Sequence, residues 1–171
     1  MRIAGLIRDS LANGEGVRDV VFVQGCEHHC EGCHNPHTWN TKAGKVTSVF
    51  TIVDMLADSP NDVTISGGEP MLQWSSLELL TYLLYNQSHK HSWLYTGFTF
   101  EEVPMKFWKE LSDNGVTVVV DGKFEKDKAD NTLRYRGSSN QRLIDLKKSV
   151  ESGEVVLWEE CHEEGMESNK R

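Results

Sequence analysis

Short runs rich in β-branched residues alternate with amphipathic stretches along most of this chain of 171 residues. The run 115–120 is the clearest strand, because a continuous apolar run is typical of a sheet that is covered on both faces. Alternation of strands with helical stretches predicts βαβ units and an α/β fold with mostly parallel strands. The predicted strands are 17–23, 62–66, 91–95, 115–120 and 154–158.

Apolar residues that recur every three or four positions predict the helices between these strands. Three predicted helices contain 49–56, 77–84 and 107–111, and a fourth is expected at about 140–150. Serine favours the N-cap position and proline the first helical turn. The expected start residues are Ser75 or Ser76 for the second helix, Pro104 for the third, and Ser138 or Ser139 for the fourth.

Two α/β architectures fit this element order, an open doubly wound sheet and an incomplete (β/α) barrel, and periodicity does not separate them. In both, ligands bind at the carboxyl ends of the strands. The chain has no internal repeat and no linker before its end, so residues 1–158 are predicted to form one domain. Residues 159–171 are rich in glutamate and are predicted to form an acidic, disordered tail.

The net charge and the lack of long apolar runs argue against two classes of partner, nucleic acids and membranes. A formal net charge of −8 argues against a nucleic acid gripped through its phosphates, since that requires a basic face. The sequence lacks the roughly eighteen consecutive apolar residues of a membrane span. It also lacks the apolar segment and cleavage site of a secretory signal. We therefore expect a cytoplasmic protein without a membrane partner.

Cys26, Cys30 and Cys33 have the spacing C-x3-C-x2-C directly after the first predicted strand. Three thiolates on one short loop can bind one metal centre, and soft sulfur ligands favour zinc or an iron-sulfur cluster. A structural zinc site needs four ligands, which nearby histidines could complete, whereas a 4Fe-4S cluster held by three cysteines keeps one iron open. The spacing alone leaves both interpretations standing, and Cys161 is left as an unassigned thiol.

This cysteine motif after the first strand resembles that of the radical S-adenosylmethionine enzymes. The sequence Gly67-Gly68-Glu69-Pro70 resembles that family's GGE/D-P loop, and the stretch 33–39 is similar to glycyl-radical activating enzymes. Within the family, the chain most resembles the activators of anaerobic ribonucleoside-triphosphate reductases. The segments that carry this closer resemblance are Asn13–Arg18, Gly32, Leu94–Gly97, Asp121–Phe124 and Arg136–Arg142. Glu15 and Tyr95 depart from it, because they stand where proline and tryptophan are usual.

The resemblance implies an incomplete (β/α) barrel of the radical S-adenosylmethionine type and the chemistry of that family. S-adenosylmethionine chelates the open iron of the cluster, and one electron cleaves it to methionine and a 5′-deoxyadenosyl radical. That radical removes a Cα hydrogen from a glycine of the partner, which is the large subunit of the anaerobic reductase. An electron donor such as flavodoxin is expected. The cofactors supply this chemistry, while the protein supplies ligation, orientation and exclusion of water.

The resemblance also assigns roles to individual residues. Cys26, Cys30 and Cys33 are the expected cluster ligands. Gly67 and Gly68 would let the backbone approach the methionine group of the cofactor, since they carry no Cβ. The remaining expected cofactor contacts are Glu69 with the α-ammonium group, Gly32 and His34 with adenine, and Thr96 with ribose or carboxylate. The segments 121–124 and 136–142 are expected to line the cofactor or to bind the partner, and the sequence leaves both possibilities open.

Two rival functions remain open on the sequence. One is another short radical S-adenosylmethionine enzyme, such as one like pyruvate formate-lyase activase. Members of that kind are usually longer and lack the Arg136–Arg142 segment. The other is a structural zinc-binding module without catalytic activity.

Overall fold

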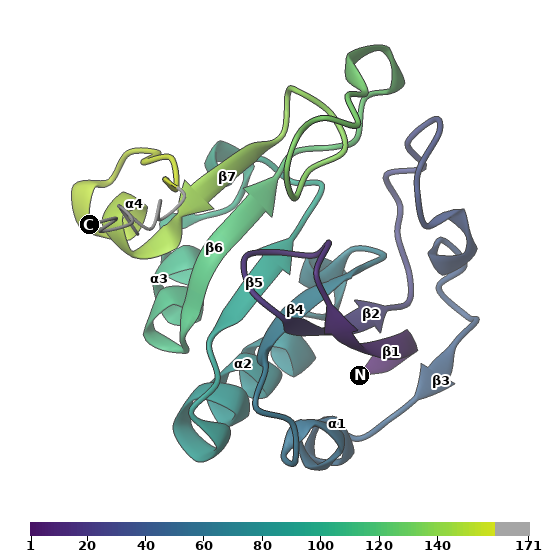
Figure 1. The fold of residues 1–171 in the computed structure, drawn as a ribbon, viewed down its shortest axis with the longest axis vertical. Helices are drawn as coiled ribbons and strands as arrows, with labels where there is room; N and C mark the ends of the chain where they lie inside the picture. Colours follow the sequence, from purple (N-terminus) through teal and green to yellow (C-terminus); the bar gives the residue numbers. More distant parts are fainter. Residues whose placement is uncertain (160–171) are drawn as a thin grey trace, which may run out of the picture.

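The computed structural model describes residues 1–159, which fold around one open sheet with the strand order β3-β1-β2-β4-β5-β6-β7 (Figure 1). The central strands β2, β4, β5 and β6 run parallel, as the sequence predicts. β1 and β3 on one side and β7 on the other join by antiparallel pairing. The strands are β1 (Arg2–Ser10), β2 (Arg18–Val23), β3 (Lys45–Val46), β4 (Asp62–Gly67), β5 (Ser92–Tyr95), β6 (Val116–Asp121) and β7 (Arg142–Asp145).

Four α-helices in the described residues form one layer on one face of this sheet. α1 packs against α2, α2 against α3, and α3 against α4. Their bounds are α1 (Val49–Leu56), α2 (Trp74–Ser88), α3 (Met105–Asp113) and α4 (Leu146–Ser152). Short 3-10 helices lie at Pro36–Thr38, Pro70–Gln73, Phe100–Glu102 and Lys126–Lys128. No helix within residues 1–159 is long and apolar enough to cross a membrane.

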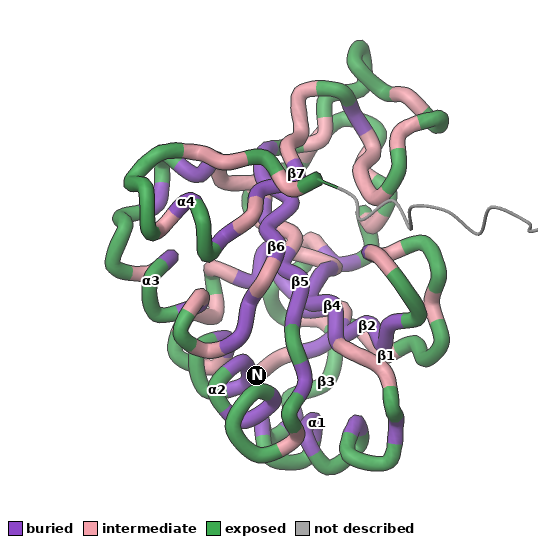
Figure 2. Tube along the Cα trace, turned by 60° about the vertical axis from the view of Figure 1, so that its left-hand side comes forward, coloured by how far each residue is buried: buried purple, intermediate pink, exposed green. Residues whose placement is uncertain are grey.

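Side chains alternate between the two faces of the sheet, because successive residues of a strand point to opposite sides. In β6, Val119 packs into the main core under the helices, whereas Val118 and Val120 pack into a second cluster on the other face. The continuous apolar run 115–120 thus belongs to a strand covered on both faces, as predicted. Figure 2 shows the buried residues concentrated along these central strands.

The second face is covered by loops. Besides Val118, Val120 and Leu143, its apolar contacts come from what we call the aromatic cluster, in which the Trp93 ring meets the Tyr135 and Trp158 rings edge-on at 5.4 and 5.1 Å. Tyr95 packs beside them. The loop-covered face therefore has its own small core, and it is this face that opens into the pocket described below.

The structure corrects the predictions for the last part of the chain. The helix expected at 140–150 begins only at Leu146, because Arg142–Asp145 pairs with β6 as the edge strand β7. Asp145, and neither Ser138 nor Ser139, caps this helix by accepting a hydrogen bond from Lys148 N at 3.0 Å. The expected strand 154–158 is reduced to one isolated bridge between Leu157 and Ile144. Pairing with neighbours in space overrode the local helical pattern here.

Two further predictions near the N-terminal half need correction. Ser75 and Ser76 do not cap α2, because the helix already begins at Trp74, directly after the 3-10 helix Pro70–Gln73. β1 was absent from the predicted strands, although it pairs along much of β2.

Of the acidic tail predicted at 159–171, only Glu159 belongs to the described residues. The rest of that segment, with Cys161, lies outside them.

Candidate functional site

The cysteine loop follows β2 at the carboxyl edge of the sheet. Cys26 N–H donates to Trp39 O at 3.2 Å, and Cys33 N–H donates to Cys30 O at 3.1 Å, so the second and third cysteines share one turn. All three cysteines are half-buried and line one open pocket of about 320 Å³. The chain's fourth cysteine lies outside the described residues, so no further thiol of residues 1–159 competes for this pocket.

Backbone N–H groups point at the three sulfur atoms. Burial raises the pKa of Cys26 and Cys30, while these N–H groups oppose that rise. The donors are His28 and His29 toward Cys26, Phe124 toward Cys30, and Asn35 toward Cys33, the last at 3.3 Å. Thiols with a raised pKa release their protons on binding a metal, and N–H donors to sulfur tune a bound iron-sulfur cluster. The donor set therefore fits a 4Fe-4S cluster with three protein ligands.

Glu69 forms the opposite wall of the pocket and is only 1% exposed. Its Oε1 accepts hydrogen bonds from Thr96 Oγ1 at 2.8 Å and Met71 N at 3.0 Å. Its Oε2 accepts one from Gly97 N at 2.8 Å and lies 2.9 Å from His28 Nε2. A buried carboxylate held by four partners has a fixed position.

Gly67 and Gly68 line the pocket beside Glu69. A Cβ on Gly67, whose φ is +103°, would stand 2.7 Å from both N and O of Val23. A Cβ on Gly68 would collide with the carbonyl oxygen of Gly25. These glycines are thus required first by the close packing of β4 on β2 and its following turn, and that packing brings Glu69 next to the cysteine loop.

Tyr95 and Thr96, at the end of β5, form a third side of the pocket. Tyr95 Oη donates to Tyr135 O at 2.6 Å, and burial raises the pKa of Tyr95 well above its usual range. The hydroxyl therefore remains protonated and ties β5 to the loop that covers it. Tyr95 belongs to the packed wall of the site and to the aromatic cluster.

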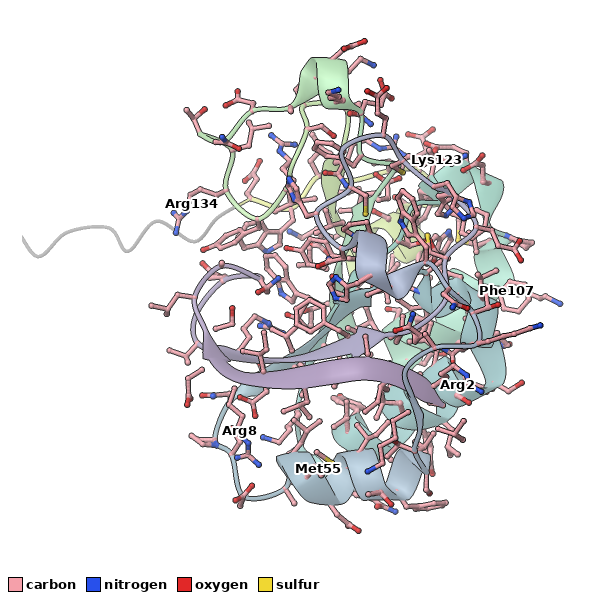
Figure 3. All side chains as sticks on the ribbon, turned by 90° about the vertical axis from the view of Figure 1, so that its right-hand side faces the viewer. Arg2, Arg8, Met55, Phe107, Lys123 and Arg134 are labelled. Carbon is pink, nitrogen blue, oxygen red and sulfur yellow. The ribbon has the colours of Figure 1, made fainter. Side chains whose placement is uncertain are left out.

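The loop between β6 and β7 forms a further side of the pocket, beside the cysteine loop. The Phe124 ring lies 4.9 Å from the His34 ring, and a Cβ on Gly32 would meet Phe124 at 3.3 Å. Lys126 Nζ pairs with Glu31 Oε1 at 2.6 Å across the surface of both loops. In Figure 3, Lys123 and Arg134 lie far apart above the ribbon of β1, whereas Arg8 and Met55 lie below it.

The structure gathers nearly all of the residues singled out from the sequence. One pocket is lined by Cys26, Cys30, Cys33, His34, Gly67, Gly68, Glu69 and Thr96. Gly32 does not line it, because its α-carbon faces Phe124 and Lys126 instead. From the late segment 136–142, Gly137 and Gln141 line the pocket, whereas Arg136 donates to Gln141 O at 2.8 Å and lines neighbouring hollows.

Several lining residues escaped the sequence analysis. Phe22, Ser66 and Asn13 line the pocket, and His28 contacts Glu69 directly. The alternation along β2 and β4 places Phe22 and Ser66 on the face opposite the helix core, so a strict period-two reading would have found them. The pairing of His28 with Glu69 has no such signal, because it joins positions that meet only after folding.

Comparison with known proteins adds independent evidence. A family model described as a 4Fe-4S single cluster domain matches residues 12–144. The anaerobic ribonucleoside-triphosphate reductase-activating protein of Enterobacteria phage T4 is 35% identical over 138 residues, which are 77% of this chain and 85% of the phage protein. The chain belongs to this family of activating proteins.

Bacterial members of the reductase-activating family match over similar spans. The protein of Pasteurella multocida is 34% identical over 140 residues, covering 77% of this chain and 89% of that protein. The protein of Escherichia coli K12 is 32% identical over 149 residues, covering 80% and 94%.

The sequence left open zinc or an iron-sulfur cluster, and a reductase activator or an enzyme like pyruvate formate-lyase activase. A 4Fe-4S domain favours an iron-sulfur cluster over structural zinc. Within residues 1–159, no three His, Cys, Asp or Glu side chains are arranged to hold a single metal ion. The relatives named above are activators of the anaerobic reductase, which favours this subfamily over pyruvate formate-lyase activase.

Proposed function

We propose that this protein activates an anaerobic ribonucleoside-triphosphate reductase by reductive cleavage of S-adenosylmethionine at a 4Fe-4S cluster. The large subunit of the reductase is the proposed partner, and one of its glycines is the proposed target. The relatives' names support the partner, and the matched cluster domain supports the cofactor. When bound, the cluster supplies the electron and S-adenosylmethionine supplies the group that removes a hydrogen atom from the glycine.

The observation that carries this proposal is the meeting of four strand ends at one pocket. The loops after β2, β4, β5 and β6 all contribute lining residues, and parallel strands bring their carboxyl ends to the same edge. The loop after β2 brings three thiols, and the loop after β4 brings a buried carboxylate. A cluster bound by Cys26, Cys30 and Cys33 would therefore face Glu69.

The remaining walls of the pocket offer the other proposed contacts to the cofactor. Glu69 is the proposed acceptor for the α-ammonium group of S-adenosylmethionine, at about 1.5–3 kcal/mol for such a charge-assisted hydrogen bond. His34, beside Phe124, is the proposed neighbour of adenine, and Thr96 of ribose or carboxylate. Because Gly32 faces the covering loop, we assign it to the packing of that loop on the cysteine turn.

The open sheet with one layer of helices supports the incomplete-barrel interpretation over a doubly wound sheet. A doubly wound sheet carries helices on both faces, whereas residues 1–159 carry theirs on one face and loops on the other. We therefore propose that the fold is an incomplete (β/α) barrel of the radical S-adenosylmethionine type. A low-potential electron donor such as flavodoxin is part of the same proposal.

The decisive experiment is anaerobic reconstitution with iron and sulfide, followed by S-adenosylmethionine, reductant and an anaerobic reductase. Electron paramagnetic resonance should report a reduced 4Fe-4S cluster, a change in its spectrum with S-adenosylmethionine, and a glycyl radical on the reductase. Pyruvate formate-lyase, offered in place of the reductase, is the matched control for the partner. A colourless protein that retains zinc, or a cluster indifferent to S-adenosylmethionine, would overturn the proposal.

A further inference from the structure

The carboxylate of Glu69 is held by donors from three separate segments of the chain. Met71 N belongs to its own loop, and Thr96 and Gly97 end β5. Thr96 Oγ1 also accepts a hydrogen bond from Phe98 N at 3.2 Å, so its hydroxyl proton is free to go to Glu69. The fourth partner, His28, is the one that comes from the cysteine loop.

The His28 ring is tightly enclosed. Its side chain is 11% exposed and meets the Phe98 ring edge-on at 4.8 Å between centroids. A Cβ on Gly97 would stand 2.6 Å from His28 Nε2, so the absence of a side chain at Gly97 makes room for the imidazole. An ionised carboxylate only accepts hydrogen bonds, so His28 Nε2 acts as the donor in that state.

We propose that His28 is a positioning residue that aligns the Glu69 carboxylate with the cysteine loop for binding of the cofactor's amino-acid group. This inference rests on the proposed function. His28 lies between Cys26 and Cys30 in sequence, so its hydrogen bond fixes Glu69 relative to two expected cluster ligands. Without it, Oε2 keeps only Gly97 N as a partner, and the Glu69 carboxylate loses its one hydrogen bond to the cysteine loop.

The test compares His28→Ala with His28→Gln, whose amide N–H₂ can donate to Glu69 in place of the imidazole. Iron and sulfide content measures cluster binding, and the change of the reduced cluster's resonance spectrum with added S-adenosylmethionine gives an apparent Kd. We expect His28→Ala to keep its cluster and to raise this Kd about tenfold, which corresponds to about 1.4 kcal/mol. His28→Gln should recover most of the affinity.

His29→Ala is the matched control within the same loop. The His29 side chain is exposed, its Nδ1 contacts only Glu27 O among the hydrogen bonds of the described residues, and its ring meets Trp39 edge-on at 5.0 Å. The backbone N–H of His29 that faces Cys26 is kept in the Ala variant. We expect the Kd of this variant to stay within about twofold of the wild-type value, since exposed substitutions usually change little.

A double-mutant cycle tests whether His28 acts through Glu69. If it does, His28→Ala should add almost nothing to the weakened binding of Glu69→Gln, because the two residues then form one unit. Additive losses would show that His28 works independently and would overturn the inference.

The remaining outcomes separate this inference from the proposed function. A wild-type spectrum that does not respond to S-adenosylmethionine overturns both. A responsive wild type with a His28→Ala Kd within twofold overturns the positioning role alone. Loss of iron from both His28 variants, with iron kept by His29→Ala, would assign His28 to cluster retention and would likewise overturn it.

Discussion

The two faces of the sheet are built in different ways. The face under α1–α4 buries most of the apolar residues, including side chains from every one of these helices. The opposite face is covered by loops, holds a smaller aromatic cluster, and opens at the carboxyl edge into the pocket with the three thiols. The helix face therefore buries most of the core, whereas the loop face forms the proposed site.

Two charged side chains are buried on the loop face or at its edge. Arg18 and Glu69 are almost fully enclosed, and both belong to the loop face or its edge. Arg18 donates to Val63 O and Thr64 Oγ1 at 2.8 Å, and its guanidinium lies over the Trp93 ring at 5.4 Å. Buried polar groups require such partners, and Arg18 finds its acceptors on the neighbouring strand β4.

The largest expected effect is on the cluster. Cys30→Ala should abolish the 4Fe-4S resonance signal after reconstitution, because it removes one of three proposed ligands. The apo protein should lose little stability, since the half-buried thiol contributes little to either core. Iron content and urea unfolding of the apo forms measure the two quantities.

Cys161→Ala is the control for Cys30→Ala, and it should keep the cluster. A Cys30→Ala variant that retained its signal while Cys161→Ala lost it would mean that the ligand set is wrongly assigned. A Cys30→Ala apo protein that no longer folds would break the division between the face that buries most of the core and the face that forms the proposed site.

The next effect concerns the helix face. Trp108 is fully buried in α3, stacks on Phe100 and donates from Nε1 to Phe100 O at 2.8 Å. Trp108→Ala should lower the free energy of unfolding by about 3–5 kcal/mol, the usual cost of emptying such a site. Phe50→Ala, at a position 58% exposed on α1, should change it by less than about 0.5 kcal/mol. Urea unfolding measures both, and equal effects would contradict the assignment of the main core.

The smallest expected effect is a pH dependence at the edge of the loop face. The bond from Arg142 lowers the pKa of Glu101 from 4.5 to about 2. A carboxyl group whose pKa is lower in the folded protein than in the unfolded protein stabilises the fold at pH values above the unfolded pKa. This contribution disappears as pH falls from about 4.5 toward 2. Because Glu101 is 61% exposed, the contribution at pH 7 is only about 0.2–1 kcal/mol.

Urea unfolding at pH 7, 5, 4 and 3 tests this pair. Glu101→Gln should be slightly less stable than wild type at pH 7, and the difference should shrink as the pH approaches 3. Glu78→Gln, at an exposed position of α2, is the control and should show no such trend. A difference that grew toward acid pH would have the wrong sign for this ion pair.

The central fold could be predicted from the sequence because its signals are local. The continuous apolar run at 115–120 and the helical spacing at 49–56 depend on neighbouring residues, and the structure confirms β6 and α1 there. The edge strands could not be predicted in this way. Arg142–Asp145 is a strand because β6 offers it a partner, and Leu143 and Ile144 then point to opposite cores.

The site, like the fold, has some features with a local sequence signal and others that depend on contacts made only after folding. By itself, the sequence determined that three thiols lie on one loop after a strand and that a Gly-Gly-Glu turn follows another strand, because both are short contiguous motifs. Only the tertiary structure decided that His28 meets Glu69 and that Phe124 covers Gly32. These contacts join residues far apart in the chain. Parallel strand order and side-chain packing create them, and no local pattern encodes them.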